Sequence, residues 1–338
     1  MSEMSDLQDL ADSVFAAADT DGDGFDAGLW GTLTETGLAR LTLSEKVGGS
    51  GAGFAESAIV LAAAGAHAAR VPLVETDLLA GWLLESAGIP IPDGPLTIAT
   101  GDLDIARTER RAAGVLHRVP WARAAAGVVM LAGDSVLLFD PAGLQIADGT
   151  NLAEEPRDTV TVDGEITASG AGDRVGEHLR VRAAFGRAAL LAGAAHGALA
   201  AAVQYAGERV QFGRPIGRFQ AVQQQLALAA AEVAAAESVV AVAARTADAD
   251  GFGADSTLFA VAAAKSRTSE AAGVVARIAH QVHGAIGFTR EHRLRHTTTR
   301  LWAWREEDGS EAEWNDLIGG RAIDAGSAEL WSLITGTP

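Results

Sequence analysis

The sequence predicts an α+β protein in which an N-terminal helical domain, a small central β domain and a C-terminal four-helix bundle follow one another. Three observations support this order. Hydrophobic residues make up 48% of the 338 residues and Ala dominates them, a composition that favours closely packed helices. Gly, Pro and short β-branched runs are concentrated in the middle of the chain, and long Ala-rich stretches return after them. We therefore expect domains at residues 1–89, 90–174 and 175–338.

The first region carries the apolar spacing of helices. Leu7, Leu10 and Val14 follow a helical period, and a second periodic run covers residues 30–41. An Ala/Leu-rich run then extends over residues 55–84 and is interrupted by Pro72. Proline removes a backbone donor and clashes with the preceding turn, so we expect a helix to end or kink there.

The central region has the pattern of short strands. Gly-Asp, Asp-Pro and Asp-Gly pairs separate the apolar runs and indicate turns. The predicted strands lie at residues 96–99, 127–131, 136–139 and 159–162.

The C-terminal region returns to long helices. Two Ala-rich stretches within residues 176–251 flank an irregular segment at 211–218, and a third helix is expected over residues 256–283. The tail, residues 290–333, contains four Trp residues at mixed spacing. Long antiparallel helices of this kind are typical of a four-helix bundle.

Composition excludes several classes of function. Acidic residues number 44 against 26 basic ones, a net charge of −18, which argues against nucleic-acid binding. The chain contains no Cys, which excludes disulfides, thiol catalysis and Cys-ligated metals. No secretory signal or uninterrupted apolar span is visible, so we expect a soluble cytoplasmic protein with no membrane association.

One short segment has the composition of a metal site. Residues 19–24 read DTDGDG, like the first half of an EF-hand loop, but the ninth and twelfth positions are Ala27 and Trp30 and supply no side-chain oxygen. The eight His residues show no metal-ligand spacing. We expect no metal, and interpret the Asp/Gly run as a turn that caps the next helix.

Two C-terminal segments carry a specific resemblance: YAGERVQFGRPIGRFQAVQ at 205–223 and HQVHGAIGFTREH at 280–292. Together they closely resemble the C-terminal bundle of the acyl-CoA dehydrogenase family, and LSEKVGGSG at 43–51 resembles a loop of its N-terminal domain. Chemistry of the residues agrees with a nucleotide cofactor, because the guanidinium of Arg209 can bind a pyrophosphate and Gly284 and Gly287 free the backbone to approach a flat ligand. Residues 213–217 are also suited to a simple turn between helices, and this alternative remains open.

The resemblance implies FAD as the cofactor, shared between two subunits. It implies that one group of residues contacts the FAD of a neighbouring subunit: Arg209, Gln211, Phe212 and Gln220. It implies that a second group holds the adenine end of the same FAD: Gln281, Val282, Gly284 and Ala285.

The resemblance also implies a reaction. In this family a carboxylate removes the α-proton of an acyl-CoA thioester and the β-hydrogen leaves as hydride to the flavin. The usual Glu-Gly-Thr segment corresponds here to Asp308-Gly309-Ser310, so Asp308 is the candidate base and Glu307 the alternative. The charged run at residues 305–308 is equally typical of a solvated cluster at a helix end.

The β domain departs from the family pattern. Residues 100–111, TGDLDIARTERR, lack the Thr-Glu-Pro segment of a complete flavin site, and residues 119–121 lack a flavin-binding Thr, although Trp121 remains available to stack. The chain thus keeps the cofactor-binding segments of the C-terminal bundle but lacks those of the β domain. In this it resembles the smaller, flavin-completing subunit of actinobacterial heteromeric acyl-CoA dehydrogenases, some of which act on fatty-acid or steroid side chains. We therefore predict an α2β2 heterotetramer with a related subunit, and otherwise a homotetramer or homodimer, that passes electrons to an electron-transfer flavoprotein or similar acceptor. Two alternatives are a self-sufficient dehydrogenase that uses Asp308 and a non-catalytic scaffold that binds acyl-CoA.

Overall fold

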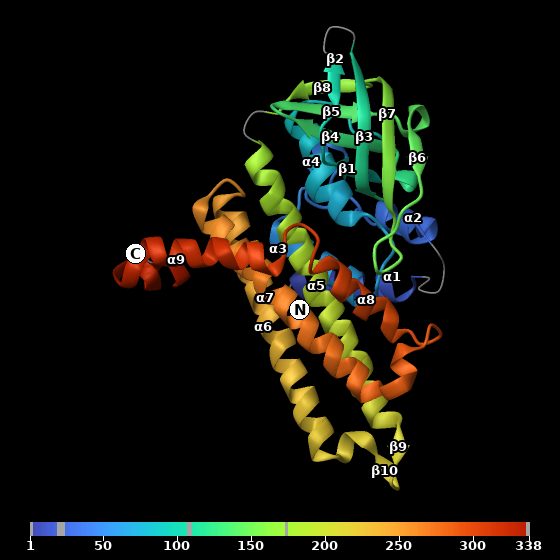
Figure 1. Cartoon of the computed structure of the whole chain (residues 1–338), viewed down its shortest axis with the longest axis vertical. Coiled ribbons are helices and arrows are strands. Elements are labelled where there is room, and N and C mark those ends of the chain that lie inside the picture. The colour runs from blue at the N-terminus through green and yellow to red at the C-terminus, as the bar shows by residue number, and fades with distance from the viewer. Residues whose placement is uncertain (1–2, 19–23, 107–109, 173–174, 336–338) are drawn as a thin grey trace. The chain divides into compact units, whose positions relative to one another are not determined.

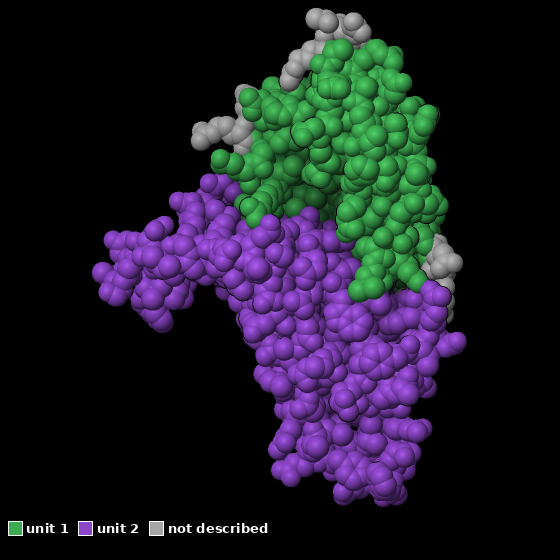
Figure 2. All heavy atoms as spheres, in the orientation of Figure 1, with its two compact units in different colours: residues 1–57, 69–183 green, residues 58–68, 184–338 purple. Residues whose placement is uncertain are grey.

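The computed structural model describes residues 3–18, 24–106, 110–172 and 175–335 of the chain. The chain forms two compact units, shown in different colours in Figure 2. Unit 1 comprises Met1–Ser57 and Ala69–Ala183, and unit 2 comprises Ala58–Ala68 and Ala184–Pro338.

The N-terminal part of unit 1 is helical, as the apolar spacing predicted. Helix α3 ends before Pro72 and a π-helix begins after it, which confirms the predicted break. The elements in this part are α1 (Glu3–Ala16), α2 (Ala27–Glu35), η1 (Glu45–Val47), the first turn of α3 (Phe54–Ala66), the π-helix η2 (Val74–Gly81) and α4 (Trp82–Ser86).

Buried polar side chains of η2 connect it to two other segments of unit 1. The Thr76 hydroxyl accepts a hydrogen bond from the Leu96 amide at 2.9 Å and donates one to the Leu96 carbonyl at 3.2 Å. The Asp77 carboxylate accepts from the Thr42 amide at 3.0 and 3.2 Å. Burial raises the pKa of Asp77 to about 7, against the lowering effect of these amide donors. The π-helix is therefore hydrogen-bonded to the first strand through Leu96 and, through Thr42, to the start of the segment at residues 43–51.

The β part of unit 1 consists of two four-stranded sheets around one apolar core (Figure 1). The strand orders are β1-β4-β5-β8 and β2-β3-β7-β6, and all neighbours are antiparallel except β1 and β4. All four predicted strands are present. The strands are β1 (Leu96–Ala99), β2 (Asp104–Ala106), β3 (Arg111–Pro120), β4 (Gly127–Ala132), β5 (Ser135–Phe139), β6 (Gln145–Ala147), β7 (Arg157–Glu165) and β8 (Ala168–Ala171).

Unit 2 contains most of the long helices, since α5 begins in unit 1 and continues into unit 2 from Ala184. The predicted helices correspond to α5, α6 and α7, and the Trp-containing tail forms two more. Their bounds are α5 (Val175–Glu208), α6 (Gln220–Asp250), α7 (Asp255–His283), η7 (Gly284–Phe288), α8 (Leu294–Trp304) and α9 (Glu311–Thr335). Helix α5 lies very close to α3, since a Cβ on Gly193 would stand 1.8 Å from the Ala62 carbonyl oxygen. Only glycine permits this approach.

Two described helices, α5 and α6, have the length and apolar composition of a membrane span. This is weak evidence for a membrane protein, because core helices of soluble proteins pass the same test.

Candidate functional site

One end of the unit 2 helices brings together the two segments that the sequence singled out. The rings of Tyr205, near the end of α5, and His283, at the end of α7, stack at a centroid distance of 4.5 Å and an angle of 23°. Arg209 follows Tyr205 by one helical turn, and its amide donates to the Tyr205 carbonyl at 2.8 Å. The segment 205–212 and the segment 281–285 are therefore neighbours.

A two-residue hairpin follows α5 at this end. Strands β9 (Val210–Gln211) and β10 (Arg214–Pro215) pair antiparallel, and both turn residues have positive φ, 52° for Phe212 and 79° for Gly213. Positive φ is costly for an aromatic residue. Phe212 is nevertheless 92% exposed. Its ring makes a T-shaped contact with the ring of Phe219, at a centroid distance of 6.1 Å and an interplanar angle of 89°. The chain thus holds an aromatic ring outward in a turn with positive φ.

The second segment is also at the surface. Gln281, Gly284 and Ala285 are exposed and Val282 is buried. Gly284 has φ 65°, and no atom lies within 4 Å of the position a Cβ would occupy. The backbone here is therefore open to a flat ligand.

His280 lies beneath this segment in a fixed protonation state. The Thr298 hydroxyl donates to the Leu294 carbonyl at 3.0 Å, so it accepts from Nε2–H of His280 at 3.0 Å. Nδ1 of His280 is buried with no hydrogen-bond partner. Burial, with the nearby His283 and His292, lowers the pKa of His280, which favours the neutral ring.

The candidate base lies elsewhere in unit 2, in an ion pair. Oδ2 of Asp308 accepts from Nε of Arg187 at 2.8 Å, and Glu307 lies 3.5 Å from Nη1 of the same guanidinium. The Arg187 side chain is 6% exposed and that of Asp308 24% exposed. Charge-assisted bonds of this kind are strong when they are shielded from water. One oxygen of the carboxylate is therefore engaged by a cation rather than free to accept a proton.

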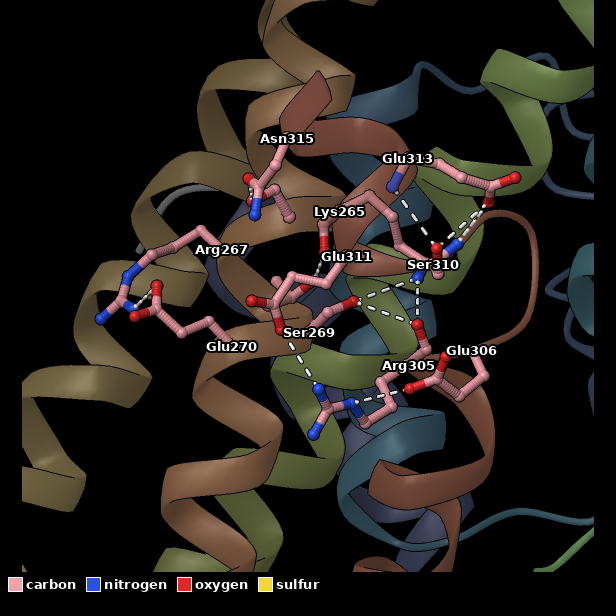
Figure 3. A network of polar contacts seen from close by, with 12 residues as sticks. Lys265, Arg267, Ser269, Glu270, Arg305, Glu306, Ser310, Glu311, Glu313 and Asn315 are labelled. Atoms are coloured by element: carbon pink, nitrogen blue, oxygen red, sulfur yellow. Dashed lines mark hydrogen bonds and ion pairs between the residues drawn. The ribbon is translucent and has the colours of Figure 1, made fainter. Parts of the chain in front are cut away.

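Two buried donors hold the turn that carries Asp308. Nζ of Lys265 donates to the carbonyls of Arg305 at 3.0 Å and Gly309 at 2.8 Å and to the Ser269 hydroxyl at 3.1 Å (Figure 3). Nε1 of Trp314 donates to the Asp308 carbonyl at 3.1 Å. The turn places Asp308 at φ 57° and Gly309 at φ 94°. Burial lowers the pKa of Lys265 to about 8, although Asp308 acts to raise it.

The charged run at 305–308 divides between two environments. Arg305 pairs with Glu306 and Glu311, each at 3.2 Å, on the partly exposed side of the turn (Figure 3). Glu307 and Asp308 instead lie against Arg187. The run ends in a capping box for α9, in which the Ser310 amide donates to Glu313 at 2.7 Å.

Comparisons with known proteins agree with the resemblance. Residues 7–89 match the model of the acyl-CoA dehydrogenase N-terminal domain, and residues 170–321 match that of the C-terminal domain. The chain is 33% identical over 281 residues to acyl-CoA dehydrogenase IpdE2 of Mycolicibacterium smegmatis, covering 80% of this chain and 79% of that protein. This chain belongs to the acyl-CoA dehydrogenase family.

Solved structures show the same fold. The ChsE4–ChsE5 complex from Mycobacterium tuberculosis matches with a TM-score of 0.85 at 24% identity, covering 96% of this chain and 98% of that one. The Tcur3481–Tcur3483 steroid ACAD matches with a TM-score of 0.80 at 25% identity, covering 96% and 99%. The predicted fold class is confirmed.

The end of the bundle has the chemistry that the FAD of an acyl-CoA dehydrogenase requires. Arg209 is exposed on an acidic chain and suits a pyrophosphate, the open backbone at Gly284 admits a flat group, and exposed aromatic rings lie beside both. Gln211 and Gln220 are also exposed at this end. These residues fit the diphosphate and adenine parts of the cofactor.

The predicted flavin contact in the β domain, Trp121, is buried, unlike the exposed residues at the end of the bundle. Trp121 belongs to unit 1, is 4% exposed and has φ 53°, and its amide donates to the Pro156 carbonyl at 3.2 Å. Among the described residues, no group of His, Asp and Glu could hold a metal ion. Residues 19–23, with most of the calcium-like segment, lie outside them.

Sequence reasoning missed two residues of the Asp308 site, Arg187 and Lys265. Each follows Ala-containing apolar residues within a long helix, and each is buried. A buried charge must be paired, so such a cation is itself a signal of an ion pair or a captured carbonyl. The sequence alone does not identify the partner, because Arg187 and Asp308 are 121 positions apart.

Proposed function

We propose that this chain is the flavin-completing subunit of a heteromeric, FAD-dependent acyl-CoA dehydrogenase. In this proposal the α,β-dehydrogenation of the acyl-CoA thioester takes place at a site of the related subunit. Bound FAD accepts the hydride. This chain contributes Arg209 and the open backbone at residues 281–285 to the nucleotide end of that cofactor.

The observation that carries the proposal is the contrast between the two candidate sites. The surface around Arg209 and Phe212 is exposed and chemically suited to a nucleotide. Asp308, which corresponds to the usual base, is held by Arg187 at 2.8 Å. A general base must bring a free oxygen to the substrate proton, and this ion pair takes up one of the two oxygens of the Asp308 carboxylate.

The comparisons support the same proposal. A similar chain is the acyl-CoA dehydrogenase IpdE2, and the similar steroid ACAD carries the names of two proteins, Tcur3481 and Tcur3483. We therefore propose a related subunit as partner in an α2β2 heterotetramer. An acyl-CoA with a fatty or steroid chain is the proposed substrate and an electron-transfer flavoprotein the acceptor, in the cytoplasm.

Expression alone and with a related subunit tests the proposal. We expect the chain alone to be colourless, and the purified complex to show flavin absorbance near 450 nm that bleaches when acyl-CoA is added. A yellow, active protein from this chain alone would instead establish a self-sufficient dehydrogenase. A complex that stays colourless would establish a scaffold.

Variants of the complex locate the residues. Arg209→Ala is expected to lower flavin retention after gel filtration, since it leaves a phosphate unpaired, and Arg245→Ala, an exposed arginine on α6, is the matched control. Full flavin occupancy in the Arg209 variant would refute the assignment of this surface.

A further inference from the structure

Helix α9 is held on α7 through its first turns. Trp314 is fully buried, and Asn315 accepts a hydrogen bond from the Ser266 hydroxyl at 2.5 Å. Less than two turns later, Arg321 pairs at 2.8 Å with Asp255, the first residue of α7. The contacts thus move toward the N-terminal end of α7 as α9 proceeds, and beyond Arg321 the helix passes that end. In Figure 1 the C-terminal end of α9 lies to the left of α7 and apart from it.

The residues that follow, 323–335, form an exposed and apolar segment that we call the C-terminal arm. Ile323 is 80% exposed, Trp331 71% and Ile334 54%. Gly326, at φ 63° and ψ 178°, interrupts the helix within the arm. No atom lies within 4 Å of the position that a Cβ on Gly326 would occupy, so the break is also open to solvent. The arm therefore presents large apolar side chains away from the helices of unit 2.

The final segment of the arm, residues 327–335, is amphipathic. Leu330, Trp331 and Ile334 fall at positions i, i+1 and i+4 and share one side of the helix. Glu329 is the only charged residue of this segment and projects away from that side. A nine-residue helix is marginal on its own in water, since isolated helices need about 12–15 residues. Contact of the apolar side with another chain therefore stabilises the helix itself.

The charge of the arm argues against a lipid surface as its partner. Helices that lie on membranes carry Lys and Arg on their polar face. Residues 323–335 contain Asp324 and Glu329 and no basic residue. The chain as a whole has a net charge of −18, which opposes its approach to anionic lipids. The apolar side is therefore suited to a groove on a protein.

The size of the apolar side indicates which protein can cover it. Nine helical residues span about 14 Å, and a helix is about 10 Å wide. A stable interface buries about 800 Å² on each partner, several times more than this side offers. Two copies of this chain, each of net charge −18, therefore have too little apolar surface here to associate through their arms alone. The arm instead suits a partner that is already held at another surface.

We propose that the C-terminal arm packs into an apolar groove of the related subunit, with Trp331 as its anchor. The inference rests on the proposed function, since it takes the flavin-sharing partner as the chain that covers the arm. Buried aromatic anchors such as Trp contribute most of the energy in interfaces of this kind. The groove is lined by aliphatic and aromatic side chains, because it has to replace water around Leu330, Trp331 and Ile334.

Assembly of the co-expressed complex tests the proposal. Dilution series in analytical ultracentrifugation give dissociation constants for the wild type, Trp331→Ala, Trp331→Phe and Glu329→Ala, the last being a control on the other side of the same helix. We expect Trp331→Ala to weaken association at least about tenfold, because it removes the anchor. Trp331→Phe should weaken it less, since a ring remains, and the control should stay within about twofold.

Flavin content separates this contact from the nucleotide surface. Asp255 and His283 lie at opposite ends of α7, which has 29 residues and is thus about 43 Å long. The arm begins near Asp255, whereas the nucleotide surface lies near His283. At concentrations where the Trp331→Ala complex is assembled, its flavin content should therefore equal that of the wild type.

Hydrogen exchange of the wild type gives a second measurement that needs no variant. Peptides from residues 323–335 should exchange more slowly in the complex than in the chain alone, because the groove protects the helix. Near-UV circular dichroism and thermal unfolding confirm that each variant is folded. If Trp331→Ala does not fold, the exchange comparison decides.

Three results would overturn the inference. In the first, the complex forms, Trp331→Ala assembles as the wild type does and the arm exchanges equally fast in both states; the proposed function then stands without this contact. In the second, the chain alone forms a dimer that Trp331→Ala abolishes, which assigns the arm to a second copy. In the third, the chain binds vesicles of phosphatidylcholine and phosphatidylglycerol through Trp331. If the wild type forms no complex with the related subunit, the proposed function itself fails.

Discussion

Replacing Asp77 by Asn changes the response of stability to pH. The Asp77 carboxylate is buried in the π-helix η2 and accepts two bonds from the Thr42 amide. Burial raises its pKa from 3.8 to about 7, so the folded protein keeps the proton over a pH range in which the unfolded chain has lost it. The contribution of Asp77 to the stability of the wild type therefore falls as pH rises from about 4 to 7. The Asn variant lacks this titration.

The size of the effect follows from the two pKa values. The shift, about 7 minus 3.8, is about 3 units, and each unit is worth about 1.36 kcal/mol, a full effect of about 4 kcal/mol. Integrated between pH 5 and pH 8 alone, the expected change is about 2.6 kcal/mol in favour of the variant. The Asn oxygen still accepts from Thr42, and any constant cost of its new N–H groups cancels between the two pH values.

Urea unfolding of both proteins at pH 5 and pH 8 measures this difference. Asp163→Asn, at a carboxyl whose side chain is 83% exposed, is the control and should change by less than about 0.5 kcal/mol. Hydrogen exchange of peptides covering residues 40–44 reports whether the Thr42 bond persists. If the Asp77 variant and the wild type show the same pH dependence, the reasoning about this buried carboxyl is wrong.

Three further predictions concern the Asp308 turn. In the active complex, Asp308→Asn should leave turnover within about twofold, because the proposed chemistry takes place at the partner's site; loss of activity in this assay would support Asp308 as base. Gly309→Ala should lower the free energy of unfolding by about 2–4 kcal/mol, since its Cβ would stand 2.4 Å from Nε1 of Trp314 at φ 94°; calorimetry with Gly319→Ala as control checks this. Lys265→Met should be less stable than the wild type at pH 7. The pKa of Lys265 is about 8 in the folded protein rather than 10.5, so as pH rises the folded wild type loses this proton before the unfolded chain does, and its free energy of unfolding increases. In urea titrations the difference in free energy of unfolding between the wild type and the Met variant should therefore widen by about 2 kcal/mol from pH 7 to 9.5. A constant difference would contradict this.

Arg209 and Arg187 lie in contrasting environments of the same chain. Arg209 is exposed at the end of the bundle, where its guanidinium is accessible to an anionic ligand. Arg187 is buried on α5 and pairs with the carboxylates of Glu307 and Asp308. A buried cation beside an acidic turn stabilises the turn's charges, and here it engages one oxygen of the Asp308 carboxylate.

The sequence by itself determined the order of the fold and most of its long elements. Apolar period and turn residues predicted α5, α6, α7 and β1 within a few residues, because these signals are local. The longest strand, β3, was missed. It reads RAAGVLHRVP, with Ala and Gly in place of β-branched residues, and is held by pairing with β2 and β7.

For the site, local motifs were sufficient to select Arg209, residues 281–285 and Asp308. The tertiary structure decided which residues contact one another around these motifs. Tyr205 stacks on His283, Phe288 stacks on His280, and Arg187 pairs with Asp308. These contacts join residues 8 to 121 positions apart. Periodicity and turn chemistry report only neighbours along the chain, whereas the pairing of a buried charge depends on which helices pack together.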